Sequence, residues 1–155
     1  GVTGVQTCAL PICRLDDFAD VAAEARAIAV AEAHADPLVT LRFLVLWPSL
    51  PRAARHVLDH RAHWDGEAYE IYAPAAERLS ADHPLAASLL LRAMVVFALS
   101  QSHSRRYRYA AEHLRQCERL EARIDDWMGI ESHSSFAGRL REAFGQRWAF
   151  WQQIS

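Results

Sequence analysis

Apolar residues recur at three- and four-residue steps along most of this chain, and no segment alternates apolar with polar residues over the length of a strand. That spacing is typical of helices that bury one face, so it predicts an all-α protein. The run over residues 85–99 has almost no polar face and is predicted to be the central, buried helix. It is too short to span a bilayer and contains Arg92, so no transmembrane helix is expected.

Proline, glycine and capping residues divide the pattern into about seven helices joined by short loops. Asp36 before Pro37 predicts a helix start, and Trp47 before Pro48 predicts that helix's end. Pro74 interrupts another helical pattern and predicts a kink or break near Tyr72, because an interior proline costs about 3 kcal/mol. The other helices are expected over residues 15–35, about 51–63, 85–99, 107–124 and 136–144, the last capped by Gly145.

Helices in such an order stack as antiparallel hairpins, because each buries its apolar stripe against its neighbours. The expected fold is therefore a fragment of a tetratricopeptide- or HEAT-like α-solenoid. Asp36-Pro37-Leu38 and His83-Pro84-Leu85 both open apolar helices, which is compatible with a duplicated unit or with chance in an alanine-rich chain. The aromatic tail, residues 148–154, is expected to pack back on the last hairpin.

The first 13 residues, GVTGVQTCALPIC, share none of this patterning. Residues 2–12 are what a common short-read sequencing adapter encodes in this frame, so residues 1–13 are predicted to be non-native. Residues 14–155 are then expected to form one helical domain, the C-terminal part of a longer protein. One cysteine, Cys117, remains outside the adapter-like segment, which predicts no disulfide framework and a reducing, cytoplasmic location. All 17 basic residues are arginine, which suggests a GC-rich bacterial source.

The sequence lacks the common catalytic patterns, so no enzyme and no cofactor is expected. It has no Glu-x-x-His pair, no His-Glu-x-x-His, no Gly-x-Ser-x-Gly and no glycine-rich phosphate loop. Cys117 lies on an apolar helical stripe and is predicted to be a small core residue. His56, His60 and His63 have the spacing of metal ligands, but a helical wheel places them opposite the packed side, facing water. No metal site is therefore expected.

The segment SHSRRYRYAAEHLR, residues 102–115, is the strongest candidate for a binding site. Arginines interleaved with tyrosines can hold phosphates and stack bases, and the net charge of −2 argues against a dedicated nucleic-acid binder. The alternative is that Ser104 caps a helix, the tyrosines pack and the arginines face solvent. The candidate binding residues are Arg105, Arg106, Arg108 and Tyr109.

Five stretches carry a family resemblance: ADPLVTLRFLVLWPSL, W-D-G-E-x-Y-E-x-x-x-P-A-A, HPLAASLLLRAMV, SRRYRYAAEHL and the closing F-G-x-x-x-x-F-W. From about residue 35 to residue 151 the chain resembles a bacterial family, domain of unknown function 6880. The resemblance implies a helical-repeat domain, and longer relatives can lie near SWIM-type zinc fingers. The Cys-x-Cys and Cys-x-His pairs of that finger are missing from this sequence, and the family supplies no catalytic residues.

Stacked helical hairpins leave grooved surfaces that bind protein segments. The sequence therefore predicts a protein-protein interaction or scaffolding domain without catalytic activity. Its partner would be an unknown protein or an upstream domain. The alternative is a nucleic-acid-binding module that uses the Arg/Tyr-rich helix start.

Overall fold

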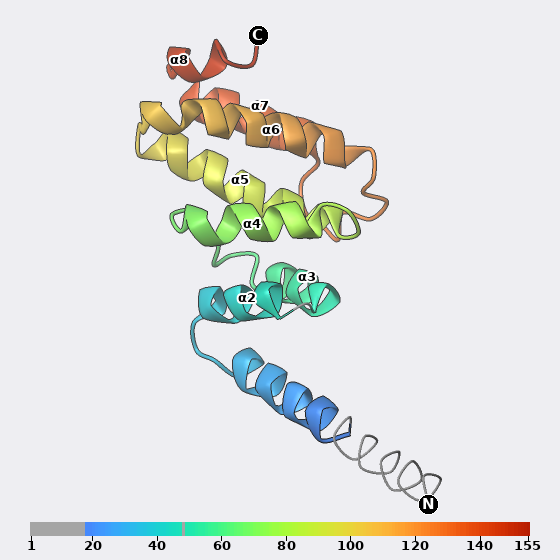
Figure 1. Cartoon of the computed structure of the whole chain (residues 1–155). Helices are drawn as coiled ribbons and strands as arrows, with labels where there is room; N and C mark the ends of the chain where they lie inside the picture. Colours follow the sequence, from blue (N-terminus) through green and yellow to red (C-terminus); the bar gives the residue numbers. More distant parts are fainter. Residues whose placement is uncertain (1–17, 48) are drawn as a thin grey trace, which may run out of the picture. The chain divides into compact units, whose positions relative to one another are not determined.

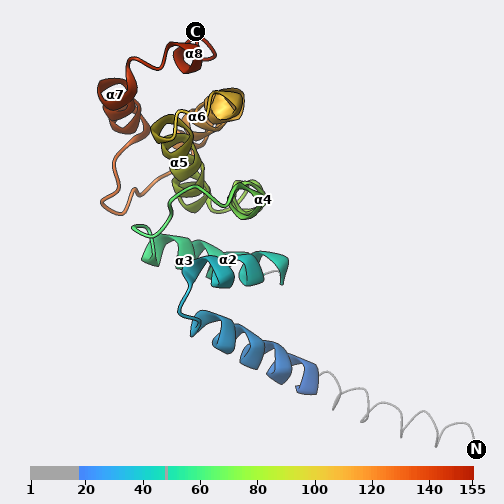
Figure 2. The same ribbon diagram turned by 90° about the vertical axis from the view of Figure 1, so that its left-hand side faces the viewer.

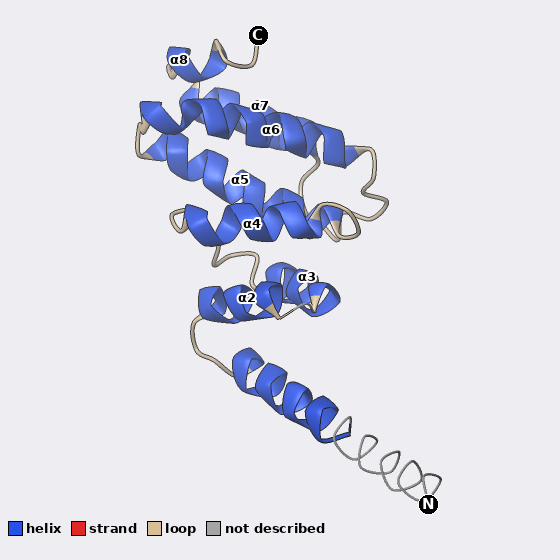
Figure 3. Cartoon of the chain, in the orientation of Figure 1, coloured by secondary structure: helices blue, strands red, loops and turns tan. Residues whose placement is uncertain are grey.

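The computed structural model describes residues 18–47 and 49–155 of the chain (Figure 1). Every regular element in those two ranges is a helix, which confirms the all-α prediction (Figure 3). The chain divides into two compact units, residues 1–40 and 41–155, and each is described by itself. The adapter-like segment predicted for residues 1–13 lies outside the described residues.

In the first unit, residues 18–32 are helical and Pro37 begins the helix α2 (Pro37–Leu46). The side chain of Asp36 accepts the main-chain N–H of Leu38 at 2.9 Å, so the predicted helix start is confirmed. The hydroxyl of Thr40 donates to the carbonyl of Ala31 at 2.5 Å, which ties the start of α2 to the preceding helix. The predicted start of that preceding helix at Leu15 lies among residues that the structure does not describe.

The second unit holds the end of α2 and the remaining helices. One of the predicted ends needs correction, because the helix expected to reach about His63 stops at Asp59. There the chain turns back, and the indole of Trp64 donates to the carbonyl of Val57 at 2.8 Å. The helices are α3 (Leu50–Asp59), α4 (Tyr69–Leu79), α5 (Pro84–Ser100), the 3₁₀ turn η1 (Ser104–Arg106), α6 (Tyr107–Glu121), α7 (His133–Phe144) and α8 (Trp148–Trp151).

The predicted central helix is α5, which packs against α3, α4, α6 and α7. Figure 1 shows α5 and α6 running side by side in opposite directions, as an antiparallel hairpin. In Figure 2, α4 and α6 lie on one side of α5 and α7 lies on the other. Leu90, Val95 and Leu99 of α5 are fully buried, which confirms the prediction from its apolar sequence.

The core of the hairpins also takes in Phe150, Trp151 and Ile154 of the aromatic tail, as predicted, but Trp148 is 75% exposed and does not pack back. The ring of Phe150 is fully buried and meets the ring of Tyr107 edge to face, with centroids 5.9 Å apart. The indole of Trp151 donates to the carbonyl of Phe144 at 2.9 Å and closes α8 onto the end of α7. The buried cluster comprises Val95, Ala98, Leu99, Tyr107, Ala110, Ala111, Leu114, Phe136, Leu140 and Phe150.

Two predictions about helix interiors and ends are corrected. The break expected near Tyr72 is absent, because α4 runs through Pro74, and Tyr72 and Leu79, buried on either side of it, hold both halves in the core. Burial of this face outweighs the one main-chain hydrogen bond that proline removes. Gly145 does stand at the end of α7, but its φ of −56° is right-handed, so it does not supply the left-handed cap expected of glycine.

The Asp65-Gly66 turn before α4 is held against α5. Gly66 has a φ of +80°, and a Cβ at this position would lie 2.1 Å from the carbonyl oxygen of Ala93. Only glycine fits so close to the backbone of α5. None of the helices in the described ranges combines the length and apolarity that a bilayer crossing requires.

Candidate functional site

A groove of about 710 Å³ lies between α4 and α6, on the face of α5 that these two helices share. We name it the α4/α6 groove. Leu91 of α5 contributes to its floor, and one face of α4 and one of α6 form its walls. The lining residues are Tyr69, Glu70, Ala73, Pro74 and Glu77 of α4, Leu91 of α5, and His113, Gln116 and Arg119 of α6.

Helical spacing explains why these residues meet. On α4, Glu70, Ala73, Pro74 and Glu77 are three or four residues apart, so they share one face of the helix. On α6 the same steps separate Tyr109, His113 and Gln116. The opposite faces of both helices carry the buried apolar residues that pack on α5.

Aromatic rings bridge the two helices at one end of the groove. The ring of Tyr69 lies 6.2 Å from that of Tyr109 and 5.7 Å from that of His113, measured between centroids. The guanidinium carbon of Arg106 lies 5.9 Å from the Tyr69 centroid and 5.7 Å from that of Phe97. Burial, with the nearby Tyr109, raises the pKa of Tyr69 although Arg106 opposes the shift.

Hydrogen bonds bridge the other end. The amide of Gln116 donates to the hydroxyl of Ser80, just after α4, at 3.2 Å. Arg123, just after α6, donates to the carbonyl of Ser80 at 2.8 Å and to that of Ala81. The two walls of the groove are thus connected at both ends, while Ala73 and Pro74 line it between.

The two walls differ in charge. On the α6 side, Glu112 forms ion pairs with Arg115 and Arg119, each at 2.8 Å, and hydrogen bonds from both arginines lower the pKa of Glu112. On the α4 side, Glu70 and Glu77 are exposed and form no ion pair with any described residue. The α4 wall therefore carries the uncompensated negative charge.

Two further polar groups bear on hydrogen bonding in the groove. Burial lowers the pKa of His113, so its imidazole is neutral at pH 7, and its buried Nε2 has no partner within the described structure. Pro74 has no N–H, so the carbonyl of Glu70 receives no helical hydrogen bond from four residues ahead. The carbonyl of Glu70 is thus without its usual donor, and Nε2 of His113 is enclosed by the surrounding residues.

The four predicted binding residues do not lie together in the structure. Arg106 and Tyr109 lie at the aromatic end of the groove, where Tyr109 remains 56% exposed. Arg105 and Arg108 are exposed and form no ion pair in the described ranges. The alternative prediction that Ser104 caps the helix is wrong, because Ser104 opens the 3₁₀ turn and no side chain caps η1 or α6.

Sequence reasoning missed the α4 wall and His113. The available signal was the spacing of Tyr109, His113 and Gln116, which repeats the spacing on α4. That signal does not say which helix faces which, and so the groove emerges only when α4 and α6 are placed on the same side of α5.

His56, His60 and His63 do not all face water, which corrects the helical-wheel prediction. His56 is only 8% exposed, because the chain folds back and places the ring of Trp64 5.8 Å from its own. The ring of His60 lies 4.3 Å from that of His56, and its Nδ1 is 3.0 Å from the carbonyl oxygen of His56. His63 is exposed as expected. Across the described residues, no group of three side chains is arranged to hold a metal ion.

Cys117 lies in the core, as predicted. Its side chain is fully buried, and its sulfur lies 3.8 Å from the carbonyl oxygen of Ser88. Burial raises the pKa of this thiol to about 11. A buried thiol with so high a pKa is a packing residue rather than a nucleophile.

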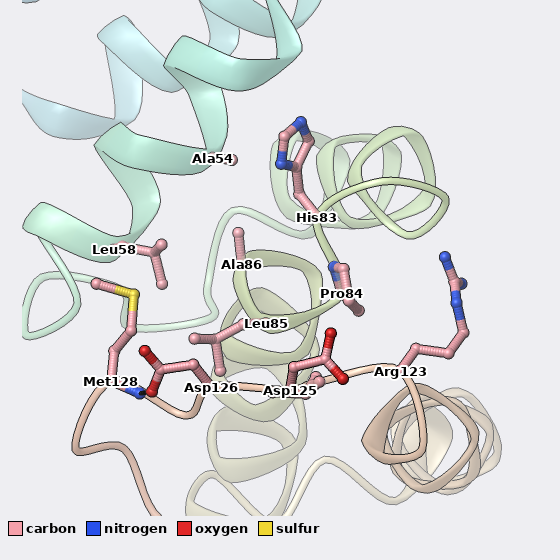
Figure 4. Close-up of a pocket in the computed structure, with 11 residues that line it drawn as sticks. Ala54, Leu58, His83, Pro84, Leu85, Ala86, Arg123, Asp125, Asp126 and Met128 are labelled. Carbon is pink, nitrogen blue, oxygen red and sulfur yellow. Dashed lines mark hydrogen bonds between the residues drawn. The ribbon is translucent and has the colours of Figure 1, made fainter.

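A second cavity, of about 290 Å³, lies between α3, the start of α5 and the loop after α6 (Figure 4). Leu58, Leu85 and Met128 contribute apolar walls. Two of its charged groups already have partners, since Asp126 accepts the N–H of Met128 at 2.8 Å and Arg123 donates to carbonyls after α4. The α4/α6 groove is larger and is lined along its length by two helices, so it is the candidate site.

A family model described as "Family of unknown function (DUF6880)" matches residues 11–153. No curated protein and no solved structure matches the chain.

Proposed function

This chain belongs to the DUF6880 family, whose function is unknown, and we propose that it is a helical interaction domain that holds a segment of a partner protein in the α4/α6 groove. The observation that carries the proposal is the groove itself, with an apolar floor, polar rims and about 710 Å³ of space. Grooves between helices commonly accept amphipathic segments of other proteins. We further infer that the stacked hairpins belong to an α-solenoid, which the alternation of helices about α5 supports (Figure 2).

The chemistry of the lining favours binding over covalent catalysis. The lining residues include no serine, threonine, cysteine or lysine. The side chains that could act as nucleophiles are therefore the two carboxylates, Tyr69 and His113, and burial raises the pKa of the Tyr69 phenol while the imidazole Nε2 of His113 is buried. Those carboxylates, Glu70 and Glu77, are exposed to solvent, where a carboxylate is well hydrated and a weak nucleophile. We therefore propose a non-catalytic role.

The proposal is tested by filling the groove. In Ala73→Arg a long side chain replaces a small one in the groove wall, whereas the control Ala143→Arg adds the same side chain at an exposed position of α7. Both variants are first checked for unchanged helical circular dichroism. Proteins captured from a lysate of the source organism by the unmodified chain and by Ala143→Arg, but not by Ala73→Arg, are the expected result. Identical capture by all three chains would contradict the proposal.

A second candidate function is nucleic-acid binding at the start of α6. It is favoured by the exposed, unpaired Arg105 and Arg108, and by a hollow of about 340 Å³ that Arg105 shares with residues 102–104 and Arg106. Fluorescence anisotropy with single-stranded RNA and DNA tests it, because phosphate contacts make affinity fall steeply as salt rises. Affinity that ignores salt, or that survives replacement of Arg105, Arg106 and Arg108 by alanine, removes this candidate.

A further inference from the structure

We propose that the segment bound in the α4/α6 groove is cationic and presents arginine side chains to the α4 wall. The inference rests on the proposed function and specifies the class of partner. It follows from the hydrogen-bonding character of that wall, which offers acceptors without matching donors.

Two carboxylates set the charge of the wall. Glu70 and Glu77 are seven residues apart on one helix, which places them on the same face and about 10 Å apart along the axis. Both are exposed, and neither forms an ion pair with a described residue. Arg119, which also lines the groove, pairs with Glu112 at 2.8 Å, but Glu112 also pairs with Arg115. The α6 side therefore keeps one net positive charge against the two negative charges of the α4 wall.

A third acceptor lies between them. The carbonyl of Glu70 lacks its helical donor because residue 74 is proline. A guanidinium group has five N–H donors and no acceptor, so it complements a wall that offers carboxylate and carbonyl oxygens. A lysine ammonium has three donors on a point charge and matches this planar set less well.

The aromatic end of the groove favours arginine for a separate reason. The guanidinium of Arg106 already lies 5.9 Å from the ring centroid of Tyr69, so the ring open to an incoming guanidinium is that of Tyr109, which is 56% exposed. Tyrosine faces attract guanidinium groups through stacking and cation–π contacts. An acidic segment or a phosphate backbone would instead meet Glu70 and Glu77 as like charges, which is unfavourable.

The experiment is a selection of random displayed peptides on the full chain. Peptides of about 16 residues are long enough to form four helical turns in a groove. Each round includes depletion on Ala73→Arg, so that retained peptides depend on the groove. We expect the retained peptides to be enriched in arginine over lysine and depleted in aspartate and glutamate. Retained peptides that are acidic, neutral or rich in lysine alone would overturn the inference and leave the proposed function standing.

Charge removal then locates the contact. Binding of a retained arginine peptide to Glu70→Gln/Glu77→Gln should be about 3- to 30-fold weaker than to the unmodified chain, the effect of two lost rim ion pairs. The control Glu118→Gln/Glu142→Gln removes the same net charge at exposed positions outside the groove and should bind as the unmodified chain does. Equal weakening in both double variants would overturn the assignment to the α4 wall.

The two proposals fail in different ways. If no peptide survives depletion on Ala73→Arg, the groove is not a docking site and the proposed function fails together with the inference. If groove-dependent peptides are retained but carry no arginine, only the inference fails.

Discussion

The phenol of Tyr72 donates a hydrogen bond to Oδ1 of Asp65 at 3.0 Å. The same oxygen accepts the main-chain N–H of Glu67 at 2.9 Å. One carboxylate therefore joins the turn before α4 to the buried face of the helix, and the Tyr72 side chain is only 2% exposed. This pair is part of what positions the α4 wall of the groove.

Stability should depend on the ionisation of Tyr72 at high pH. Burial, and next the hydrogen bond to Asp65, raise the pKa of Tyr72 from 10.0 to about 12. The folded state therefore favours the protonated phenol, so its contribution is complete below pH 10 and is lost as the pH rises toward 12. Urea unfolding should show a steeper loss of stability over this range for the unmodified chain than for Tyr72→Phe, by about 1 to 3 kcal/mol. Parallel curves would contradict this, and Tyr109→Phe serves as the exposed control.

Gly66→Ala should destabilise the fold by about 3 kcal/mol or more, because the new Cβ is placed against main-chain atoms that have no room to move. The nearest is the carbonyl oxygen of Ala93, at 2.1 Å, and the φ of +80° adds strain. Gly138→Ala is the matched control, since nothing lies within 4 Å of its Cβ. In the interior of α7 that change should raise stability by about 0.5 to 1 kcal/mol. Thermal unfolding of both variants measures the difference, and equal midpoints would refute the prediction.

Pro74→Ala should stabilise the chain by about 1 to 2 kcal/mol, because restoring a helical hydrogen bond outweighs the added freedom of the unfolded chain. The new N–H also donates to the carbonyl of Glu70. An arginine peptide selected on the groove should therefore bind more weakly, despite the higher stability of the variant. Pro84→Ala is the control, because proline is well suited to the first turn of α5 and its removal should bring no gain. A drop in the thermal midpoint of Pro74→Ala would show that the proline favours α4.

Arg92 is a buried cation that α7 and the preceding loop hold in place. It is 5% exposed, its Nη1 donates to the carbonyl of Glu131 at 2.9 Å, and the rings of Trp127 and Phe136 lie 5.2 and 4.8 Å from its guanidinium carbon. Its Nε and Nη2 are buried without a partner among the described residues. Arg92→Ala should cost about 2 to 4 kcal/mol by opening a cavity, whereas Arg92→Met should cost less than about 1.5 kcal/mol. Equal losses by chemical denaturation would show that the charge, rather than the volume, is what matters.

Cys117 should react with a thiol reagent only when the protein unfolds. The side chain is fully buried and its pKa is raised to about 11, so at about pH 8 little thiolate is present. The measurement uses a chain with Cys8→Ser and Cys13→Ser, in which the labelling rate should rise with urea in step with the unfolded fraction. Labelling in buffer as fast as in denaturant would contradict the buried position.

The sequence correctly predicted helices and helix starts that depend only on residues a few positions apart. The apolar run of α5 and the stripe of α6 through Leu114, Cys117 and Leu120 gave helices that the structure confirms. Asp36 before Pro37 marked the start of α2, because a side-chain cap and a proline in the first turn act within three residues. These features need no information about distant parts of the chain.

The errors come from contacts between residues far apart in the sequence or across a turn. The break expected at Pro74 is overruled by burial of Tyr72 and Leu79 in the core. His56 is buried by Trp64, which returns to α3 only after the helix has ended. The start of α6 was identified as a binding region from its composition. Of its arginines only Arg106 contacts the aromatic end of the groove, however, and the groove depends equally on α4, which no local pattern could place beside α6.

Hydrogen bonds from Gln116 and Arg123 join α6 to the segment after α4, and an aromatic contact joins the two helices at the opposite end of the groove. These contacts have a consequence for the kinetics of binding. Because these contacts already hold the two walls of the groove in position, the groove need not open before a ligand enters. The association rate constant should therefore be that of an ordinary diffusional encounter. Differences in affinity among ligands would then appear mainly as differences in residence time. The conformational entropy lost on association would be lost by the incoming chain rather than by this one.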